Sequence, residues 1–199
     1  MNSASQRRSC LLQPGVASGR PDDPQTQQFI SIIGDRLRHG SAVRVLEIGA
    51  GRGRLVAAIT ELLRGTSDLH PEHLTYVAYE DPRFVDAEHQ RACKGHLDTL
   101  CALGAHARYS TSLAELQAMP DERADVVVLA NTLHEVPVED WLQLFEDVRR
   151  SSKPEASLLV IEDQEPRTGE LPHPREFLIL EENESCALVG TRIRASAKD

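Results

Sequence analysis

The sequence predicts an α/β fold, a three-layer sandwich in which a mostly parallel, doubly wound sheet lies between helices. Two observations support this prediction. Short apolar runs alternate with segments of helical periodicity along the chain from residue 24 to about residue 161. The first of these runs, Val43–Ile48, passes into three glycines and then into a helix-like pattern. Parallel strands need crossover connections, which are right-handed, so we expect helices on both faces of the sheet.

The N-terminal part divides into a tail and a first helix. Residues 1–23 are rich in Ser, Pro, Gly and Arg and are expected to form a disordered tail, so the domain spans residues 24–199. The first 20 residues contain Arg7, Arg8 and Arg20 and no acid, which weakly resembles a transit peptide. A helix is expected to begin at Pro24, with Asp23 as its N-cap, and to end at Gly40. This helix either covers a ligand or only packs on the sheet.

The remaining elements follow from apolar patterning. The expected strands are residues 43–48, 73–79, 105–109, 125–130 and 157–161, and the expected helices between them are residues 53–64, 83–103 and 137–150. The strand at 125–130 is the clearest, because four consecutive apolar residues follow an acid. Residues 165–199 are irregular, with two strand-like runs after a proline-rich loop. They are expected to form a lid or a truncated hairpin, unless the chain is a trimmed form or one domain of a larger assembly.

Composition narrows the class of protein. The 199 residues favour a single domain, and the formal net charge of −9 argues against a broad nucleic-acid surface, which needs clustered Lys and Arg. The four cysteines form no CxxC pair and indicate reduced thiols in a cytoplasmic protein. No apolar run reaches the roughly 18 residues of a membrane span, so no membrane segment is expected.

Gly49, Gly51 and Gly53 follow the first strand at G-x-G-x-G spacing. Glycines let the backbone approach a ligand, and the helix start offers free N–H groups, so the stretch indicates a nucleotide-type site. The dinucleotide fingerprint needs a glycine where this chain has Arg54, which disfavours a nicotinamide-dependent enzyme. No Gly-Lys-Ser/Thr follows, which argues against a phosphate-binding P-loop. The simpler alternative is an ordinary glycine-rich turn.

An acid, Glu47, lies two residues before the first glycine, and the combination resembles the class I S-adenosylmethionine-dependent methyltransferases, a Rossmann-like family. The resemblance implies S-adenosyl-L-methionine as the cofactor. This cofactor carries an ammonium group and no phosphate, which suits a nearby carboxylate better than a bare anion site. By this resemblance, the methionine end of the cofactor is bound by Glu47 and the turn residues Gly49, Ala50, Gly51 and Gly53.

The second and third strands end in candidate groups for the rest of the cofactor. The resemblance assigns Glu80 to the ribose, because one carboxylate can accept hydrogen bonds from both hydroxyls, and it puts Asp81 beside the same ligand. Alternatively, an acid here, Asp81 in particular, only stabilises the N-terminus of the next helix. The family often has an acid after the third strand for the adenine, but this chain has Ser110-Thr111-Ser112. We expect a hydroxyl, that of Thr111, or a backbone group to serve instead.

The fourth strand runs into Asn-Thr-Leu-His-Glu-Val, residues 131–136, which resembles the fourth methyltransferase motif of small-molecule enzymes. The resemblance puts Asn131 beside the cofactor, and His134 and Glu135 at the mouth of the site. His134 can act as a general base, since its intrinsic pKa lies near neutral, or it can brace the loop by hydrogen bonds. Asp163 follows the fifth strand and completes the set of candidate catalytic residues.

The helix expected at 83–103 carries residues that could bind a metal ion. His89, Cys93 and His96 lie at i, i+4 and i+7, a spacing that can place ligands on one helix face. No carboxylate partner is evident, and cysteine is commonly a core residue. No metal site is therefore predicted.

The sequence thus predicts an S-adenosylmethionine-dependent methyltransferase that acts on a small molecule or a protein side chain. The Asn/Asp-Pro-Pro-Tyr signature of enzymes that methylate exocyclic or amide nitrogens does not follow the fourth strand, which counts against a DNA base or a glutamine as acceptor. The alternative is a catalytically weak or inactive methyltransferase-like domain that binds a protein partner through its C-terminal segment. The missing acid after the third strand and the irregular C-terminus motivate this alternative.

Overall fold

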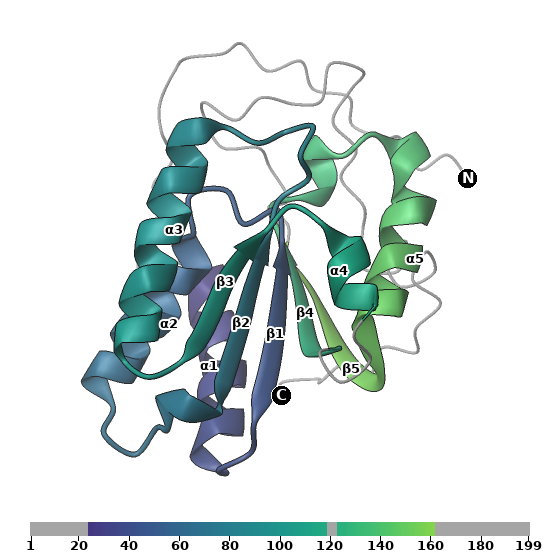
Figure 1. Ribbon diagram of the computed structural model, residues 1–199. Helices are drawn as coiled ribbons and strands as arrows, with labels where there is room; N and C mark the ends of the chain where they lie inside the picture. The colour runs from purple at the N-terminus through teal and green to yellow at the C-terminus, as the bar shows by residue number, and fades with distance from the viewer. Residues whose placement is uncertain (1–23, 119–122, 162–199) are drawn as a thin grey trace.

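The computed structural model describes residues 24–118 and 123–161 (Figure 1). Within these ranges, one five-stranded sheet consists of β1 (Val43–Ile48), β2 (Leu74–Tyr79), β3 (His106–Ser110), β4 (Ala124–Ala130) and β5 (Ser152–Ile161). All neighbouring strands are parallel, in the order β3-β2-β1-β4-β5. The predicted parallel, doubly wound sheet is therefore confirmed for the described part of the chain.

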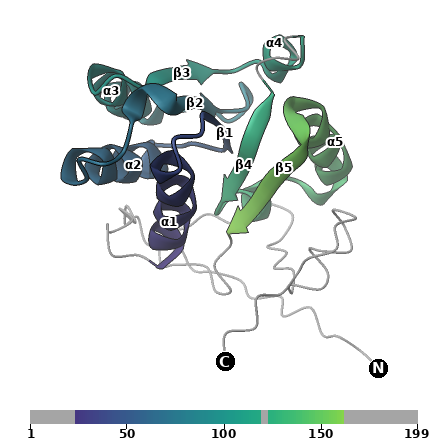
Figure 2. The ribbon, with the colours of Figure 1, turned by 90° about the horizontal axis from the view of Figure 1, so that it is seen from below.

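Helices cover both faces of this sheet. One face carries α1 (Pro24–Arg38), α2 (Arg54–Gly65) and α3 (Ala87–Ala102), and the other carries α4 (Leu113–Gln117) and α5 (Trp141–Ser151), as Figure 2 shows. Strand β1 lies at the centre of the sheet, with β2 and β3 on one side of it. After β3 the chain crosses back, and β4 pairs with the other edge of β1. Sheets of this class bind ligands in the crevice at such a reversal, beyond the carboxyl ends of the strands.

The two faces of the sheet belong to two separate apolar cores. Val45 and Tyr76 pack into the core that contains α1, α2 and α3, whereas Leu46 and Val77 pack into the core that contains α4 and α5. Successive strand residues point to opposite faces, so this division follows from the alternation along β1 and β2. In β4, residues 126–129 are 0% exposed, because both faces are covered. That double coverage explains why this strand is a continuous apolar run in the sequence.

Two helices begin later than the sequence predicts. Helix α3 begins at Ala87 instead of residue 83, because the Asp86 side chain caps it by accepting hydrogen bonds from two backbone N–H groups of the first turn. Helix α5 begins at Trp141, and α4, of only five residues, was not predicted. The short 3-10 helices are η1 (Pro71–His73), η3 (Leu133–Glu135) and η4 (Val138–Asp140).

The ends of the chain carry predictions that the structure does not test. The predicted tail, residues 1–23, and the predicted lid or hairpin, residues 165–199, lie outside the described residues. Among the residues that are described, no helix has the length and apolar character needed to cross a membrane.

Candidate functional site

Three strands end side by side at the carboxyl edge of the sheet. In the strand register, Ile48 at the end of β1 lies beside Tyr79 of β2 and Leu129 of β4. The segments that follow these strands therefore meet at one edge. We call residues 49–53, after β1, the glycine turn, and residues 131–136, after β4, the β4 turn. The sequence-predicted residues Gly49–Gly53, Glu80, Asp81 and Asn131 are brought together at this edge.

The glycine turn depends on left-handed backbone. The φ angles of Gly49, Gly51 and Gly53 are 74°, 50° and 80°, a region that residues with a Cβ rarely adopt. The backbone N–H groups of Gly49 and Ala50 both donate to the carbonyl oxygen of Tyr79, at 3.0 and 3.3 Å. These two bonds fix the turn to the end of the neighbouring strand β2.

The three glycines face different surroundings. A Cβ added to Gly49 would lie 2.5 Å from Oγ1 of Thr132, and one added to Gly53 would lie 3.0 Å from Cα of Cys93. The first and third glycines therefore allow other parts of the chain to pack closely. A Cβ added to Gly51 would meet no atom of the described residues within 4 Å. Within the described part of the chain, the backbone of the central glycine is thus open to an approaching ligand.

The carboxylate of Glu80 lies beside this open glycine. Its Oε2 accepts a hydrogen bond from the backbone N–H of Gly51 at 2.8 Å. Burial raises the pKa of Glu80 above its ordinary value, the Gly51 hydrogen bond opposes the rise, and the charges of Glu135 and Asp81 add to it. Acidic groups from two strand ends therefore influence one another at this edge, which favours a cationic ligand.

Glu47 lies deeper, beneath the glycine turn. It is 3% exposed, and its Oε2 accepts a hydrogen bond from Oη of Tyr76 at 2.7 Å. Burial raises the pKa of Glu47 to about 7, against the opposing effects of the Tyr76 hydrogen bond and the charge of Arg54. Tyr76 was not among the residues predicted for the site. Tyr76 pairs with Val45 in the strand register, and Glu47, two residues after Val45, lies on the same face of the sheet. Knowledge of that register would have placed Tyr76 beside Glu47.

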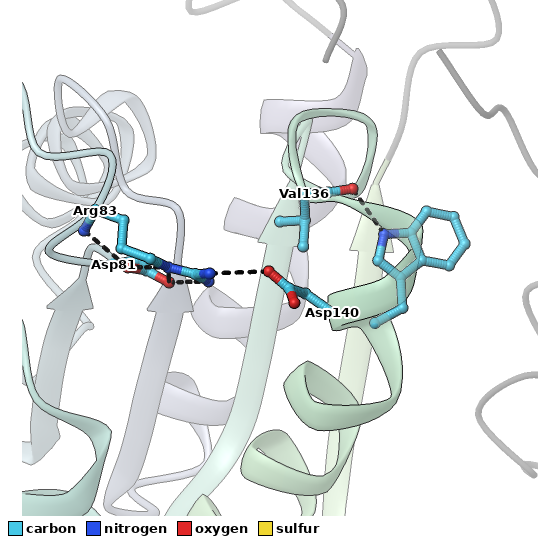
Figure 3. A network of polar contacts seen from close by, with 5 residues as sticks. Asp81, Arg83, Val136 and Asp140 are labelled. Atoms are coloured by element: carbon cyan, nitrogen blue, oxygen red, sulfur yellow. Dashed lines mark hydrogen bonds and ion pairs between the residues drawn. The ribbon is translucent and has the colours of Figure 1, made fainter. Parts of the chain in front are cut away.

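An ionic bridge crosses the site edge beside Asp81 (Figure 3). Arg83 binds Asp81 through Nη2 and Oδ2 at 2.7 Å, and its Nη1 donates to Oδ2 of Asp140 at 2.9 Å. Burial raises the pKa of Asp81, but the hydrogen bonds and charge of Arg83 outweigh burial and hold it below its ordinary value. The interpretation of Asp81 as the N-terminal acid of the next helix is wrong, because Asp86 caps α3. Neither Arg83 nor Asp140 was predicted to belong to the site.

The β4 turn is tied to three other elements. Asn131 has a left-handed φ of 55°, and its N–H donates to the last carbonyl of β5 at 2.7 Å. The hydroxyl of Thr132 donates to the carbonyl oxygen of Ile48 in β1 at 3.0 Å. The indole Nε1 of Trp141, at the start of α5, donates to the carbonyl oxygen of Val136 at 3.0 Å (Figure 3). Asparagine tolerates the left-handed region better than most residues, which suits it to this strand end.

The other predicted site residues are placed only in part. The backbone of His134 lies in η3, and the neighbouring Glu135 side chain is exposed. Thr111 is exposed directly after β3, whose last carbonyl accepts a hydrogen bond from the backbone N–H of Glu80 at 3.1 Å. Asp163 lies outside the described residues. The roles assigned to these residues stay predictions.

The histidines and the cysteine considered as metal ligands do not converge. Cys93 is 0% exposed in the core, whereas His89 and His96 are exposed. The interpretation of Cys93 as a core residue is confirmed. In residues 24–118 and 123–161, no group of three or more His, Cys, Asp or Glu side chains could hold a metal ion.

Comparison with known families decides the class of protein. Residues 46–160, more than half of the 199, match the family model described as a methyltransferase domain. The chain belongs to the methyltransferase family. The resemblance to the class I enzymes is thereby confirmed, and the cofactor of this methyltransferase is S-adenosyl-L-methionine.

One solved structure shares the fold, and two others are similar over part of their length. A SAM-dependent methyltransferase from Aquifex aeolicus is 21% identical with a TM-score of 0.54, and the match covers 85% of this chain and 82% of that one. An O-methyltransferase family protein from Burkholderia thailandensis is 19% identical with a TM-score of 0.47, over 70% of this chain and 39% of that one. A SAM-dependent methyltransferase from Thiobacillus denitrificans, solved with S-adenosyl-L-homocysteine, is 16% identical with a TM-score of 0.45, over 71% and 49%. This methyltransferase therefore spans half or less of the length of the last two proteins. None of the curated proteins matches its sequence.

The carboxyl edge of this methyltransferase fits its cofactor on two counts. The backbone at Gly51 is open within the described residues, so a ligand can lie against it. The Glu80 carboxylate stands 2.8 Å from that backbone N–H and can accept hydroxyl hydrogen bonds. No phosphate-binding lysine is needed for a cofactor without phosphate, and the acidic surroundings suit its positive charge.

Proposed function

We propose that this chain transfers the methyl group of S-adenosyl-L-methionine to a small molecule or to a protein side chain. The observation that carries the proposal is the pairing of an open glycine turn with Glu80 at the reversal point of the sheet. When bound, the cofactor supplies a methyl group on a positively charged sulfur, ready for attack by a nucleophile. The protein mainly contributes proximity and orientation.

The cofactor side consists of the glycine turn and the end of β2. The backbone of residues 49–53 lies against the methionine end, and Glu47 beneath it favours the ammonium group by its charge. Glu80 accepts hydrogen bonds from the ribose hydroxyls, with Asp81 alongside. Thr111 and Asn131, at the ends of β3 and β4, complete the contacts.

The acceptor side is the β4 turn, on the other side of β1 from Glu80. A general base is needed there only if the nucleophile arrives protonated. His134 takes that role, and Glu135 and Asp163 orient the acceptor. The exposed position of Glu135 leaves its carboxylate accessible to such a ligand.

The class of acceptor follows from charge and motif. The formal net charge of −9 disfavours a polyanionic substrate such as DNA. The fourth strand is followed by Asn-Thr-Leu-His and not by Asn/Asp-Pro-Pro-Tyr, which supports acceptors other than exocyclic or amide nitrogens. A small molecule or a protein side chain remains the best-supported class.

Calorimetry with S-adenosyl-L-methionine tests the cofactor site. We expect the full chain to bind, and Glu80→Gln to bind about tenfold more weakly, since it loses a charged hydrogen-bond acceptor. Glu61→Gln, an exposed carboxylate change on α2, serves as the control and is expected to bind like the native chain. Absence of binding at millimolar cofactor would contradict the proposed cofactor site and the proposed activity.

Transfer of an isotope-labelled methyl group in cell extract tests the acceptor class. We expect the label in a small molecule or a protein, identified by mass spectrometry, and about tenfold less transfer by Glu80→Gln at limiting cofactor. Label that accumulates only in DNA would contradict the proposed acceptor class while leaving the cofactor site intact.

A further inference from the structure

The side chain of Thr132, in the β4 turn, contacts the glycine turn and the end of β1. It is 6% exposed, and its hydroxyl lies 3.0 Å from the carbonyl oxygen of Ile48 and 3.3 Å from that of Ala130. A hydroxyl has one proton to donate, so the shorter contact, to β1, is the better hydrogen bond. This bond joins the last residue of β1, directly before the glycine turn, to the β4 turn.

The rest of the Thr132 side chain fills the space over Gly49. A Cβ on Gly49 would lie 2.5 Å from Oγ1 and 2.6 Å from Cγ2 of Thr132. Glycine is required at this position both for its φ of 74° and for the room that Thr132 occupies. The two turns therefore pack against each other at this point, and the Thr132 hydroxyl bond fixes their relative position.

Beyond Thr132, the β4 turn is internally bonded. The backbone N–H of Glu135 donates to the carbonyl of Thr132 at 3.0 Å, and that of Val136 donates to Leu133 at 3.2 Å. At its far end, the carbonyl of Val136 accepts the indole hydrogen bond of Trp141. A displacement that begins at Thr132 therefore reaches Trp141.

We propose that Thr132 is a positioning residue that couples the two sides of the site. It makes the glycine turn and the β4 turn move as one unit, so that a ligand fixing the first also fixes the second. The inference rests on the proposed function, which puts the cofactor on the glycine turn and Asn131, and the acceptor on the rest of the β4 turn. Rates of group transfer are sensitive to small errors in position, so this coupling serves the alignment of the two reactants.

The chain carries its own reporter for this coupling. Trp141 is its single tryptophan, and it is bonded to the end of the β4 turn. We expect S-adenosyl-L-homocysteine, titrated into the full chain, to change Trp141 fluorescence while calorimetry gives the affinity. Thr132→Val keeps the side-chain shape and removes the hydroxyl. It is expected to weaken binding about fivefold and to abolish most of the fluorescence change at saturation.

Matched variants separate coupling from general destabilisation. Thr60 is also buried, at 3% exposure, and its hydroxyl also donates to a backbone carbonyl, that of Val56 at 2.7 Å. It lies within α2, so Thr60→Val is expected to keep native affinity and the native fluorescence change. Thr132→Ser retains the hydroxyl and is expected to restore both. If Thr132→Val does not fold, the contrast between Thr132→Ser and Thr132→Ala decides, and equal responses in these two overturn the proposal.

The outcomes distinguish the two proposals. No binding of S-adenosyl-L-homocysteine by the native chain overturns the proposed function itself. Native binding without a change in Trp141 fluorescence overturns the coupling alone. The coupling is also overturned if Thr132→Val binds and responds as the native chain does.

Discussion

The glycine turn and the β4 turn are neighbours, but they are held in place by different means. The glycine turn is shaped by its own backbone, with three left-handed glycines and two hydrogen bonds to the carbonyl of Tyr79. The β4 turn has backbone hydrogen bonds too, but side chains attach it to β1 and α5, through the hydroxyl of Thr132 and the indole of Trp141. A backbone-shaped turn tolerates almost no change of residue, whereas a turn held by side chains loses its contacts one at a time. A single substitution should therefore lower the free energy of unfolding more in the glycine turn than in the β4 turn.

Gly49→Ala is the most direct way to break the glycine turn. The added Cβ would lie 2.5 Å from Oγ1 of Thr132, on a backbone with φ of 74°. Strain and overpacking together should lower the free energy of unfolding by about 3–5 kcal/mol, measured by urea denaturation. Gly65→Ala is the control, because a Cβ there meets no described atom within 4 Å, and its effect should stay within about 1 kcal/mol. A cost for Gly49→Ala no larger than that of the control would refute the steric argument.

Glu47→Gln tests the charge beneath the glycine turn. The pKa of Glu47 is raised from 4.5 to about 7 in the folded chain, so its contribution to stability is full below pH 4.5 and is lost as pH rises through 7. The lost contribution is roughly 3 kcal/mol. The native chain loses this contribution as pH rises, and Glu47→Gln has none to lose. The unfolding free energy of Glu47→Gln minus that of the native chain should therefore increase by that amount from acid to alkaline pH. A difference that stays constant with pH for Glu47→Gln would rule out the raised pKa.

Trp141→Phe tests the side-chain attachment of the β4 turn. It removes the indole hydrogen bond to Val136 and some buried volume, since Trp141 is 3% exposed. The unfolding free energy should fall by about 1–2 kcal/mol, less than for Gly49→Ala. Leu142→Ala, one residue along and 74% exposed, should change it by less than about 0.5 kcal/mol. If Trp141→Phe costs as much as Gly49→Ala, the contrast between the two turns does not hold.

Arg83→Ala tests the bridge across the site and carries the smallest expected effect. The Arg83 side chain is 58% exposed, so solvent screens its pairs with Asp81 and Asp140. The loss in unfolding free energy should be below about 1 kcal/mol and should shrink in high salt. Arg64→Ala, which removes an exposed pair with Glu61 on α2, provides the comparison. A loss that persists unchanged at high salt would show that the bridge acts by packing and not by charge.

The sequence predicted the parts of this molecule that depend on neighbours along the chain. The apolar runs located the strands, and the rule that parallel strands end at one edge brought the glycine turn and Glu80 together. The start of α3 was misplaced because four residues, ending in the Asp86 cap, lie between Pro82 and the helix. A helix as short as α4 has too little periodicity to detect.

Contacts between distant residues were beyond sequence reasoning. The Tyr76–Glu47 hydrogen bond joins residues 29 positions apart, and the Thr132–Ile48 bond joins residues 84 positions apart. Either pair follows only once the register and order of the strands are known. The side chains that hold the β4 turn were therefore missed, although the turn itself was located by its motif.

The carboxyl group of Glu47, which titrates near neutrality under the glycine turn, makes binding at that turn a proton-linked event. Positive charge brought to the turn favours the ionised carboxylate, lowers its pKa, and releases part of a proton to the solvent. The heat of binding near neutral pH then contains the ionisation heat of the buffer. The binding enthalpies measured in phosphate and in Tris at the same pH should therefore differ. The difference should equal the fraction of a proton released, multiplied by the difference between the ionisation enthalpies of the two buffers. Glu47→Gln has no such proton to release, so its binding enthalpy should be the same in both buffers.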